Sequence, residues 1–160
     1  MNQFEILFGK EKYQIFLFSC PACFPFSFAR HTWFVVCRDG DISRWEIFWR
    51  PQKWEKRWGH LHKDFYRPVQ GIARFIFSEK ILYKKVRLLG KVEGGEDSLA
   101  QQMAELIEAS PRIYPFNYEY SLIGPNSNTY SQWIIDRFPS SGLKLSWNSL
   151  GKNRVPAPRK

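Results

Sequence analysis

Two residues that lie far apart in the chain carry the side chains of a nucleophile and of a base that would activate it. Ser127 lies in the stretch GPNSNTY, residues 124–130, and His31 begins the strand-like stretch HTWFVVC. A serine hydroxyl is a weak nucleophile until a base takes its proton, and a helix N-terminus stabilises the charge that then develops. Imidazole titrates near neutrality, so His31 is the natural base. The pair would therefore suit nucleophilic catalysis.

Ser127 also has a purely structural interpretation. Asn, Ser and Thr are the residues that helix N-termini prefer, because their side chains accept hydrogen bonds from the first free backbone N–H groups. The following SQWIIDRF is typical of an amphipathic helix, and we expect that helix over residues 127–138. The residues alone leave two roles open for Ser127, a helix cap or a nucleophile.

The first third of the chain predicts an antiparallel β-meander. The stretches YQIFLFS (13–19), HTWFVVC (31–37) and ISRWEIFW (42–49) are rich in aromatic and β-branched residues, as strands are. RDGD, between the last two, is a hairpin turn signal. These strands are expected to place His31 at the start of the middle strand of the three.

The third of these stretches alternates in polarity. Trp45 and Ile47 point one way along a strand, and Arg44 and Glu46 point the other. If this alternation is purely structural, the tryptophan lies in the core and the charged residues face water.

The second part of the chain is predicted to be richer in helices. Helical spacing of apolar residues, or a helix-cap signal, marks three stretches, 68–80, 98–110 and 127–138. Residues 81–89 and 116–123 are predicted as strands, and residues 90–97 as a turn. The result is an α+β fold, a small antiparallel sheet packed against helices. We expect one domain over residues 1–152, followed by a basic tail, 153–160.

The charge of the chain favours anionic partners. Lys and Arg number 24 against 15 Asp and Glu, so the net charge is 24 − 15 = +9. Basic residues interleaved with tryptophan between residues 44 and 67 supply a candidate anion-binding face, Arg50, Lys53, Lys56 and Arg57. The sequence contains no RRM, KH or zinc-finger pattern, so we expect weak, non-specific, salt-sensitive polyanion binding. Docking on an anionic membrane surface is the competing use of this face.

The cysteines give no metal-site pattern. A structural zinc site needs four ligands, and the pair Cys20 and Cys23 has no second CxxC partner. His31 and Cys37 would lie roughly 20 Å apart on one strand, which is too far to share a metal ion. We expect no metal and no cofactor.

The uncharged run at residues 13–29 raises the question of a membrane segment. Prolines interrupt it, and it is shorter than the ~20 apolar residues that a spanning helix needs. We therefore expect no transmembrane span and a cytoplasmic protein, with a membrane-peripheral location as the alternative. A role of this run in export or anchoring stays open.

Four strings in this order, HTWFVV, WEIFW, YPFNYEYSLIGPNSNTYSQWI and LSWNSLGK, resemble an uncharacterised bacterial family, a domain of unknown function marked by GPNSNT. More distantly, the order is similar to that of circularly permuted papain-like hydrolases of the NlpC type. These include the lecithin:retinol acyltransferase-like enzymes and the deubiquitinating PPPDE peptidases. In them a strand histidine comes first and a cysteine opens a later helix.

The distant resemblance implies a role for each candidate residue. By position His31 would be the base, Ser127 the nucleophile and Glu46 the residue that orients the base. Asn126 and Asn128 would be oxyanion or cap donors. Serine stands where those relatives have cysteine, which implies either a serine variant of the chemistry or a site that has lost its reaction.

The resemblance therefore implies a hydrolase or acyltransferase that acts on amide, ester or thioester bonds of a small-molecule, peptide or lipid-like substrate. The alternative is a non-catalytic module that holds an anionic ligand, either nucleic acid or an anionic membrane surface, in the same cleft or on the basic, tryptophan-rich face.

Overall fold

The predicted β-meander forms the centre of the fold. In the computed structural model, which describes residues 8–23, 25–49, 56–72 and 86–154, β1 (Tyr13–Pro21) pairs antiparallel with β2 (Arg30–Arg38), and β2 pairs antiparallel with β3 (Asp41–Ile47). Asp39 and Gly40, at the turn between β2 and β3, have φ values of 50° and 87°. Two successive positive φ angles are what a two-residue hairpin turn requires, and an Asp-Gly pair accepts them readily.

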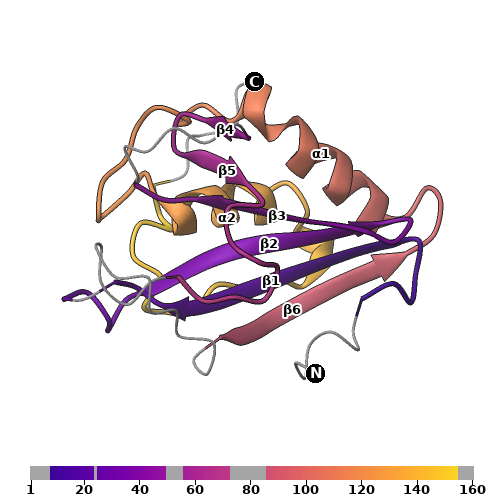
Figure 1. Cartoon of the computed structure of the whole chain (residues 1–160), viewed down its shortest axis with the longest axis horizontal. Coiled ribbons are helices and arrows are strands. Elements are labelled where there is room, and N and C mark those ends of the chain that lie inside the picture. The colour runs from indigo at the N-terminus through magenta and orange to yellow at the C-terminus, as the bar shows by residue number, and fades with distance from the viewer. Residues whose placement is uncertain (1–7, 24, 50–55, 73–85, 155–160) are drawn as a thin grey trace.

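Three further strands extend the sheet on both sides. β4 (Arg57–Trp58) and β5 (Leu61–Lys63) lie beyond β3, and β6 (Arg87–Gly94) pairs with β1. The strand order in the described residues is β4-β5-β3-β2-β1-β6, and every pair is antiparallel (Figure 1).

The prediction of a turn over residues 90–97 was wrong for its first half, because β6 runs to Gly94. The glycines that suggested a turn serve the strand instead. The register shifts opposite Gly90, where β6 bulges against β1, and a Cβ on Gly94 would lie 2.5 Å from the Cβ of Ser98. The predicted strand at 81–89 begins later, at Arg87, and residues 81–85 lie outside the described part of the chain.

The helix predicted at residues 98–110 is α1 (Leu99–Ile113), capped by the side chain of Ser98. It continues for two residues past Pro111, although proline has no N–H to donate to the carbonyl of Ile107. The hydroxyl of Ser110 donates to that carbonyl instead, at 2.6 Å. The freed acceptor is thereby satisfied, and the last turn of the helix survives.

Two other expectations of local structure need correction. Residues 116–123 form turns and not a strand, and their backbone bonds to other loops; the carbonyl of Asn117, for example, accepts the N–H of His60 at 2.6 Å. Residues 68–72, the start of a predicted helix, are not helical, and residues 73–80 lie outside the described residues. The helix expected at 127–138 is α2 (Ser127–Ile135), followed by a short 3₁₀ helix, η3 (Pro139–Ser141).

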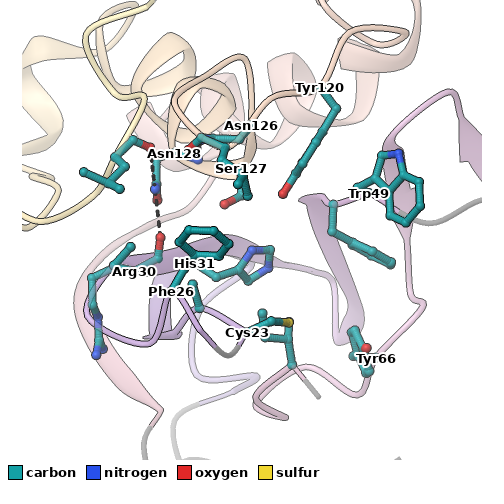
Figure 2. Close-up of a pocket in the computed structure, with 16 residues that line it drawn as sticks. Cys23, Phe26, Arg30, His31, Trp49, Tyr66, Tyr120, Asn126, Ser127 and Asn128 are labelled. Atoms are coloured by element: carbon teal, nitrogen blue, oxygen red, sulfur yellow. Dashed lines mark hydrogen bonds between the residues drawn. The ribbon is translucent and has the colours of Figure 1, made fainter. Parts of the chain in front are cut away.

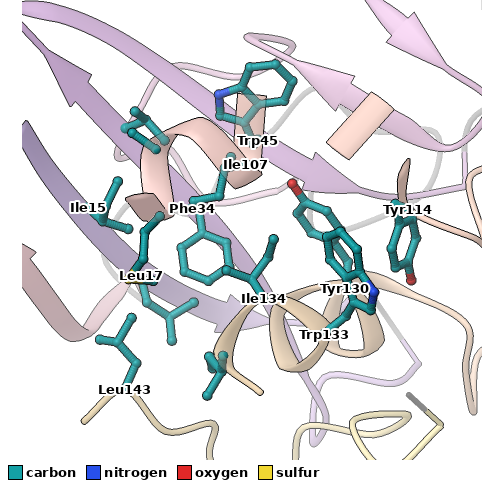
Figure 3. Packing of buried hydrophobic residues seen from close by; sticks show 14 of the residues in the cluster. Ile15, Leu17, Phe34, Trp45, Ile107, Tyr114, Tyr130, Trp133, Ile134 and Leu143 are labelled. Atoms are coloured by element: carbon teal, nitrogen blue, oxygen red, sulfur yellow. The ribbon is translucent and has the colours of Figure 1, made fainter. Parts of the chain in front are cut away.

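The two faces of the sheet are covered differently. On the first face, α1 and α2 pack against an apolar cluster in which Leu17, Phe34 and Ile134 meet (Figure 3). The second face carries the alternate residues of β1 and β2, among them Phe16, Phe18 and Trp33, in a separate cluster. Within the described residues the fold is α+β, a small antiparallel sheet with helices on its first face.

The second face also corrects the expectation that the charged residues of β3 face water. The side chains of Arg44 and Glu46 are completely buried there. Alternation along a strand decides which face a residue is on, but it does not decide whether that face is covered.

Among the described residues, none of the helices has both the length and the apolar character that crossing a bilayer requires.

Candidate functional site

Ser127 and His31 both line a pocket of about 350 Å³ at the end of the sheet where β2 begins (Figure 2). Asn126 and Asn128 also line it. The structure thus brings four of the predicted site residues to one cavity, although they come from segments almost a hundred residues apart.

The start of α2 is held by an extensive cap. The Oδ1 of Asn126 accepts the N–H groups of Asn128 and Thr129 at 3.0 and 3.3 Å, and the hydroxyl oxygen of Thr129 accepts the N–H of Asn126 at 3.1 Å. This reciprocal arrangement is a capping box. The hydroxyl of Thr129 donates in turn to the carbonyl of Gly151 at 2.8 Å. The cap therefore ties the helix start to the C-terminal segment.

The two asparagine amides already have partners in the fold. The Nδ2 of Asn126 donates to the carbonyls of Ser121 and Leu122, at 3.3 and 3.0 Å. The Nδ2 of Asn128 donates to the carbonyls of Arg30 and Leu150, both at 2.8 Å (Figure 2). An amide group has two N–H donors, so neither asparagine side chain has one left for a substrate.

Ser127 takes no part in this cap. Its Oγ accepts the backbone N–H of Thr32 over 3.4 Å, which is long for a hydrogen bond. The backbone N–H of Ser127 has no hydrogen-bond partner within the described part of the chain, as is usual for the first residue of a helix. Ser127 therefore presents a loosely held hydroxyl and a free N–H donor beside the pocket.

His31 is bound on its other side to a buried ion pair. Its Nε2 lies 2.8 Å from Oε2 of Glu46, and Nη2 of Arg44 lies 2.7 Å from the same oxygen. The guanidinium of Arg44 is fixed by the carbonyls of Arg67 and Gln70, and it lies 4.1 Å from the centre of the Trp33 ring. The His31 ring stacks against Trp33 as well, with centroids 6.0 Å apart. These contacts hold the imidazole in one orientation.

The charge state of Glu46 determines which nitrogen of His31 is available. Burial alone would raise the pKa of Glu46, but the charge of Arg44 and the hydrogen bond with His31 outweigh it and lower the pKa from 4.5 to about 2. Glu46 is thus an ionised acceptor near neutral pH, and Nε2 of His31 carries the proton that it accepts. The lone pair of the neutral imidazole then resides on Nδ1.

His31 and Ser127 approach the pocket from different sides of the sheet. By strand alternation His31 shares the second face with Trp33, whereas its neighbour Thr32 faces α2 and bonds to Ser131 at 2.8 Å. Within the described residues, no direct hydrogen bond joins the His31 ring to the Ser127 hydroxyl. The ring is bound to Glu46, and the hydroxyl accepts the N–H of Thr32. The two side chains still face the same space, because α2 starts at the end of β2 (Figure 2).

The rest of the pocket wall is mainly apolar and was missed by the sequence interpretation. Phe26, Phe48, Ile72 and Leu122 line it, and Tyr120 extends its side chain into it (Figure 2). Burial raises the pKa of the Tyr120 hydroxyl, so this group stays neutral. These residues come from loops, for which neither periodicity nor spacing gives a position.

Arg44 was also missed as a site residue, although the sequence holds a signal for it. It precedes Glu46 by two residues on one strand, so both side chains must lie on one face and within reach of each other.

Of the four predicted anion-binding residues, the structure describes two, Lys56 and Arg57, and neither lines the pocket. Lys56 lies 3.7 Å from a carboxylate oxygen of Asp64, and Arg57 lies in β4. Arg50 and Lys53 are outside the described residues.

Burial raises the pKa of the Cys20 thiol to about 11. The described His, Cys, Asp and Glu residues form no group that could hold a metal ion.

Comparison with known proteins gives a family but no characterised relative. Neither the curated proteins nor the solved structures contain a match to this chain. One family model does match, over residues 12–154, and its description is a protein of unknown function, DUF3750. That match covers most of the chain, and the protein therefore belongs to the DUF3750 family.

Proposed function

We propose that the pocket is an acyl-transfer site in which Ser127 is the nucleophile, His31 the base and Glu46 the residue that orients the base. The observation that supports this is the bond between His31 and a buried, ionised Glu46, which leaves Nδ1 of His31 as the basic nitrogen beside the pocket that Ser127 lines. A nucleophile, a base and a carboxylate in this order are the parts of a serine hydrolase site.

The reaction follows from these roles. His31 Nδ1 accepts the hydroxyl proton while Ser127 Oγ bonds to the carbonyl carbon of the substrate. When the tetrahedral intermediate collapses, the bond from carbon to nitrogen, oxygen or sulfur breaks, and His31 gives its proton to the leaving group. Water or another acceptor then attacks the Ser127 ester and passes its proton to His31, which returns it to Ser127. Glu46 stays ionised throughout and accepts Nε2–H.

The start of α2 supplies the stabilisation of the oxyanion. The free N–H of Ser127 and the positive end of the helix dipole act on the developing charge. The amides of Asn126 and Asn128 do not take this role in the proposal, because their N–H groups are bound to carbonyls of the fold. Their contribution is to fix the helix start.

The substrate class is an amide, ester or thioester with an apolar acyl group. Apolar side chains make up most of the wall, and about 350 Å³ is enough for a small ligand or for part of a larger one. The order of base before nucleophile fits a permuted papain-like arrangement, which is part of this proposal.

A labelling experiment tests the chemistry. A fluorophosphonate probe that reacts with activated serines is expected to label the wild-type protein slowly, and not to label Ser127→Ala or His31→Ala. A wild-type protein that is folded and gives no label, or a His31→Ala variant that labels like the wild type, would contradict the proposed roles.

A cysteine in place of Ser127 tests whether the pair is assembled. In a Cys23→Ser background, which removes the native thiol at the pocket, Ser127→Cys is expected to have a lowered thiol pKa and to react quickly with iodoacetamide. The matched control is Leu99→Cys, which also occupies the first position of a helix but has no histidine opposite. Equal rates for the two thiols would show that His31 does not act on position 127.

The second candidate function is a module that binds a ligand in the same pocket without reaction. The observation that favours it is the bond of Ser127 Oγ to Thr32 N–H in place of a direct bond to His31. Ligand binding that survives Ser127→Ala, together with an unreactive Ser127→Cys, is the result expected for this candidate.

A further inference from the structure

Large apolar side chains are exposed around the mouth of the pocket. Trp49 and Leu122 both line the pocket and are both 53% exposed, and Phe26 and Leu150 line it as well. Phe28, whose ring stacks edge-on against that of Phe26, is 66% exposed, and Trp147, which precedes the Asn148 that bonds to Phe28, is 88% exposed. We call these six side chains, four aromatic and two leucine, the aromatic rim. A patch of this kind on a folded domain marks an interaction site, because it costs free energy in water.

The loops that carry the aromatic rim are joined to one another, although they come from distant parts of the chain. The rings of Phe26 and Phe28 are 6.4 Å apart. The side chain of Asn148 donates to the carbonyl of Phe28 at 2.7 Å, and the carbonyl of Asn148 accepts the N–H of Arg30 at 3.2 Å. These bonds join the loop that carries Trp147 to the loop that carries the two phenylalanines. The shared pocket joins both loops to Trp49 and Leu122.

The segments that carry most of the rim also carry an excess of positive charge. Residues 21–30, 116–126 and 146–154 contain Arg30, Lys152 and Arg154, and their one carboxylate is Glu119. Arg154 is exposed, and Lys152 is half-buried with its Nζ bonded to the carbonyl of Ser146. The whole chain has a net charge of +9. A partner for this surface must therefore be apolar in its interior and anionic where it meets water.

We propose that the aromatic rim docks on an anionic membrane surface. Tryptophan and other aromatic side chains settle at the boundary between headgroups and acyl chains, and Lys and Arg near that boundary are attracted to anionic headgroups. The rim supplies the aromatic side chains, and the segments that carry it supply Arg30, Lys152 and Arg154. Docking would set the mouth of the pocket against the headgroup region. The surface differs from the predicted basic face at residues 50–57, and the proposal does not depend on the chemistry of Ser127.

Vesicle binding tests the proposal. The full chain is mixed with vesicles made of equal parts phosphatidylglycerol and phosphatidylcholine, and in parallel with phosphatidylcholine alone, and the bound fraction is measured by sedimentation. We expect binding to the anionic vesicles that weakens as salt is added, together with a blue shift of tryptophan emission. Absence of binding to the anionic vesicles would overturn the proposal.

Paired variants test whether the rim is the docking surface. Phe28→Ser with Trp147→Ser is expected to weaken vesicle binding at least tenfold. The control, Ile42→Ser, removes an exposed apolar side chain at the hairpin end of β2 and β3, far from the pocket, and should leave binding unchanged. Arg154→Gln is expected to weaken binding about fivefold, which corresponds to about 1 kcal/mol for one cation near the surface. Lys10→Gln, an exposed cation outside the rim, is its control.

The remaining outcomes are also decisive. Equal losses for the rim variant and for Ile42→Ser would place the binding elsewhere and overturn the proposal. So would a rim variant that changes only the oligomeric state measured by sedimentation velocity, because the rim would then contact a second protein copy. Ser127→Ala is expected to bind vesicles like the wild type, so that failure of the catalytic proposal and failure of docking are seen separately.

Discussion

The two faces of the sheet are both buried, but they are held together by different forces. The first face packs Leu17, Phe34 and their neighbours against α1 and α2, and the transfer of apolar surface out of water stabilises it. The second face buries Arg44, Glu46 and His31 among aromatic rings. Charges lose their hydration there, and they are stable only because each has its partner.

This difference indicates what each face is for. An apolar core would cover the second face at lower cost, since replacing a buried ion pair by apolar residues of similar volume is often neutral or stabilising. The ion pair does something that an apolar core does not do: it fixes the ring of His31 and holds the negatively charged carboxylate of Glu46 against Nε2–H of that ring. We interpret the first face as the source of stability and the second as the support of the site.

The largest expected effect comes from removing the positive member of the ion pair. Arg44→Met leaves Glu46 buried without a counter-charge and is expected to lower the free energy of unfolding by about 3–5 kcal/mol. Arg38→Met is the matched control. Arg38, the last residue of β2, makes an ion pair of 2.6 Å with Glu108 of α1, and both side chains are partly exposed. That variant should lose at most about 1 kcal/mol. Urea unfolding followed by circular dichroism measures both.

A double variant separates the lost partner from the lost volume. Arg44→Met with Glu46→Gln removes both charges, so it should be more stable than Arg44→Met alone. If the double variant is no more stable than the single one, the unpaired carboxylate is not the cause, and the contrast between the two faces is wrong.

The next largest expected effect is a loss of folding stability at low pH. The pKa of Glu46 is about 2 in the folded protein, against 4.5 for the ordinary group. A lowered folded pKa gives stability that is complete above 4.5 and is lost as pH falls toward 2, and this shift corresponds to on the order of 3 kcal/mol.

The pH dependence is checked by comparing free energies of unfolding at about pH 6 and about pH 3. The wild type should lose stability over this range by more than the variant with Arg44→Met and Glu46→Gln does. A first-face variant such as Leu17→Ala, which removes apolar contacts, should lose the same amount relative to the wild type at both pH values. Parallel pH profiles for the wild type and the double variant would contradict the role assigned to Glu46.

Much of the first face could be predicted from the sequence, because its signals are local. The signals are the runs of aromatic and β-branched residues at 13–19 and 31–37, the turn at Asp39 and Gly40, and the cap before α1, and each depends on a few neighbouring residues. The strand expected at 116–123 failed because its alternation was weak and its backbone bonds to distant loops. β6 was misplaced because glycines in an edge strand look like a turn.

The site was predictable only in part. GPNSNT indicated a helix start, and the capping box at Asn126 and Thr129 has the residue types that such a start prefers. Glu46 was named through a distant resemblance, and its bond to His31 depends on the pairing of separate strands. The burial of Arg44 could not be read from one strand, because the cover of the second face includes carbonyls from residues 67 and 70. The apolar pocket wall is built from loops that come together only in three dimensions.

The smallest effect concerns the helix start, where the first face meets the site. Asn126 accepts two backbone N–H groups and donates to two carbonyls, so Asn126→Ala is expected to destabilise the protein by about 1–2 kcal/mol. Ser127 makes one long bond and takes no part in the capping box, so Ser127→Ala should change stability by less than about 0.5 kcal/mol. Both are measured by urea unfolding at neutral pH. A Ser127→Ala variant as unstable as Asn126→Ala would assign the serine to the cap, and the hydroxyl would then have a structural role that accounts for it without any reaction. A near-neutral change would leave a buried hydroxyl beside the pocket that the fold does not need, which is what the proposed nucleophile requires.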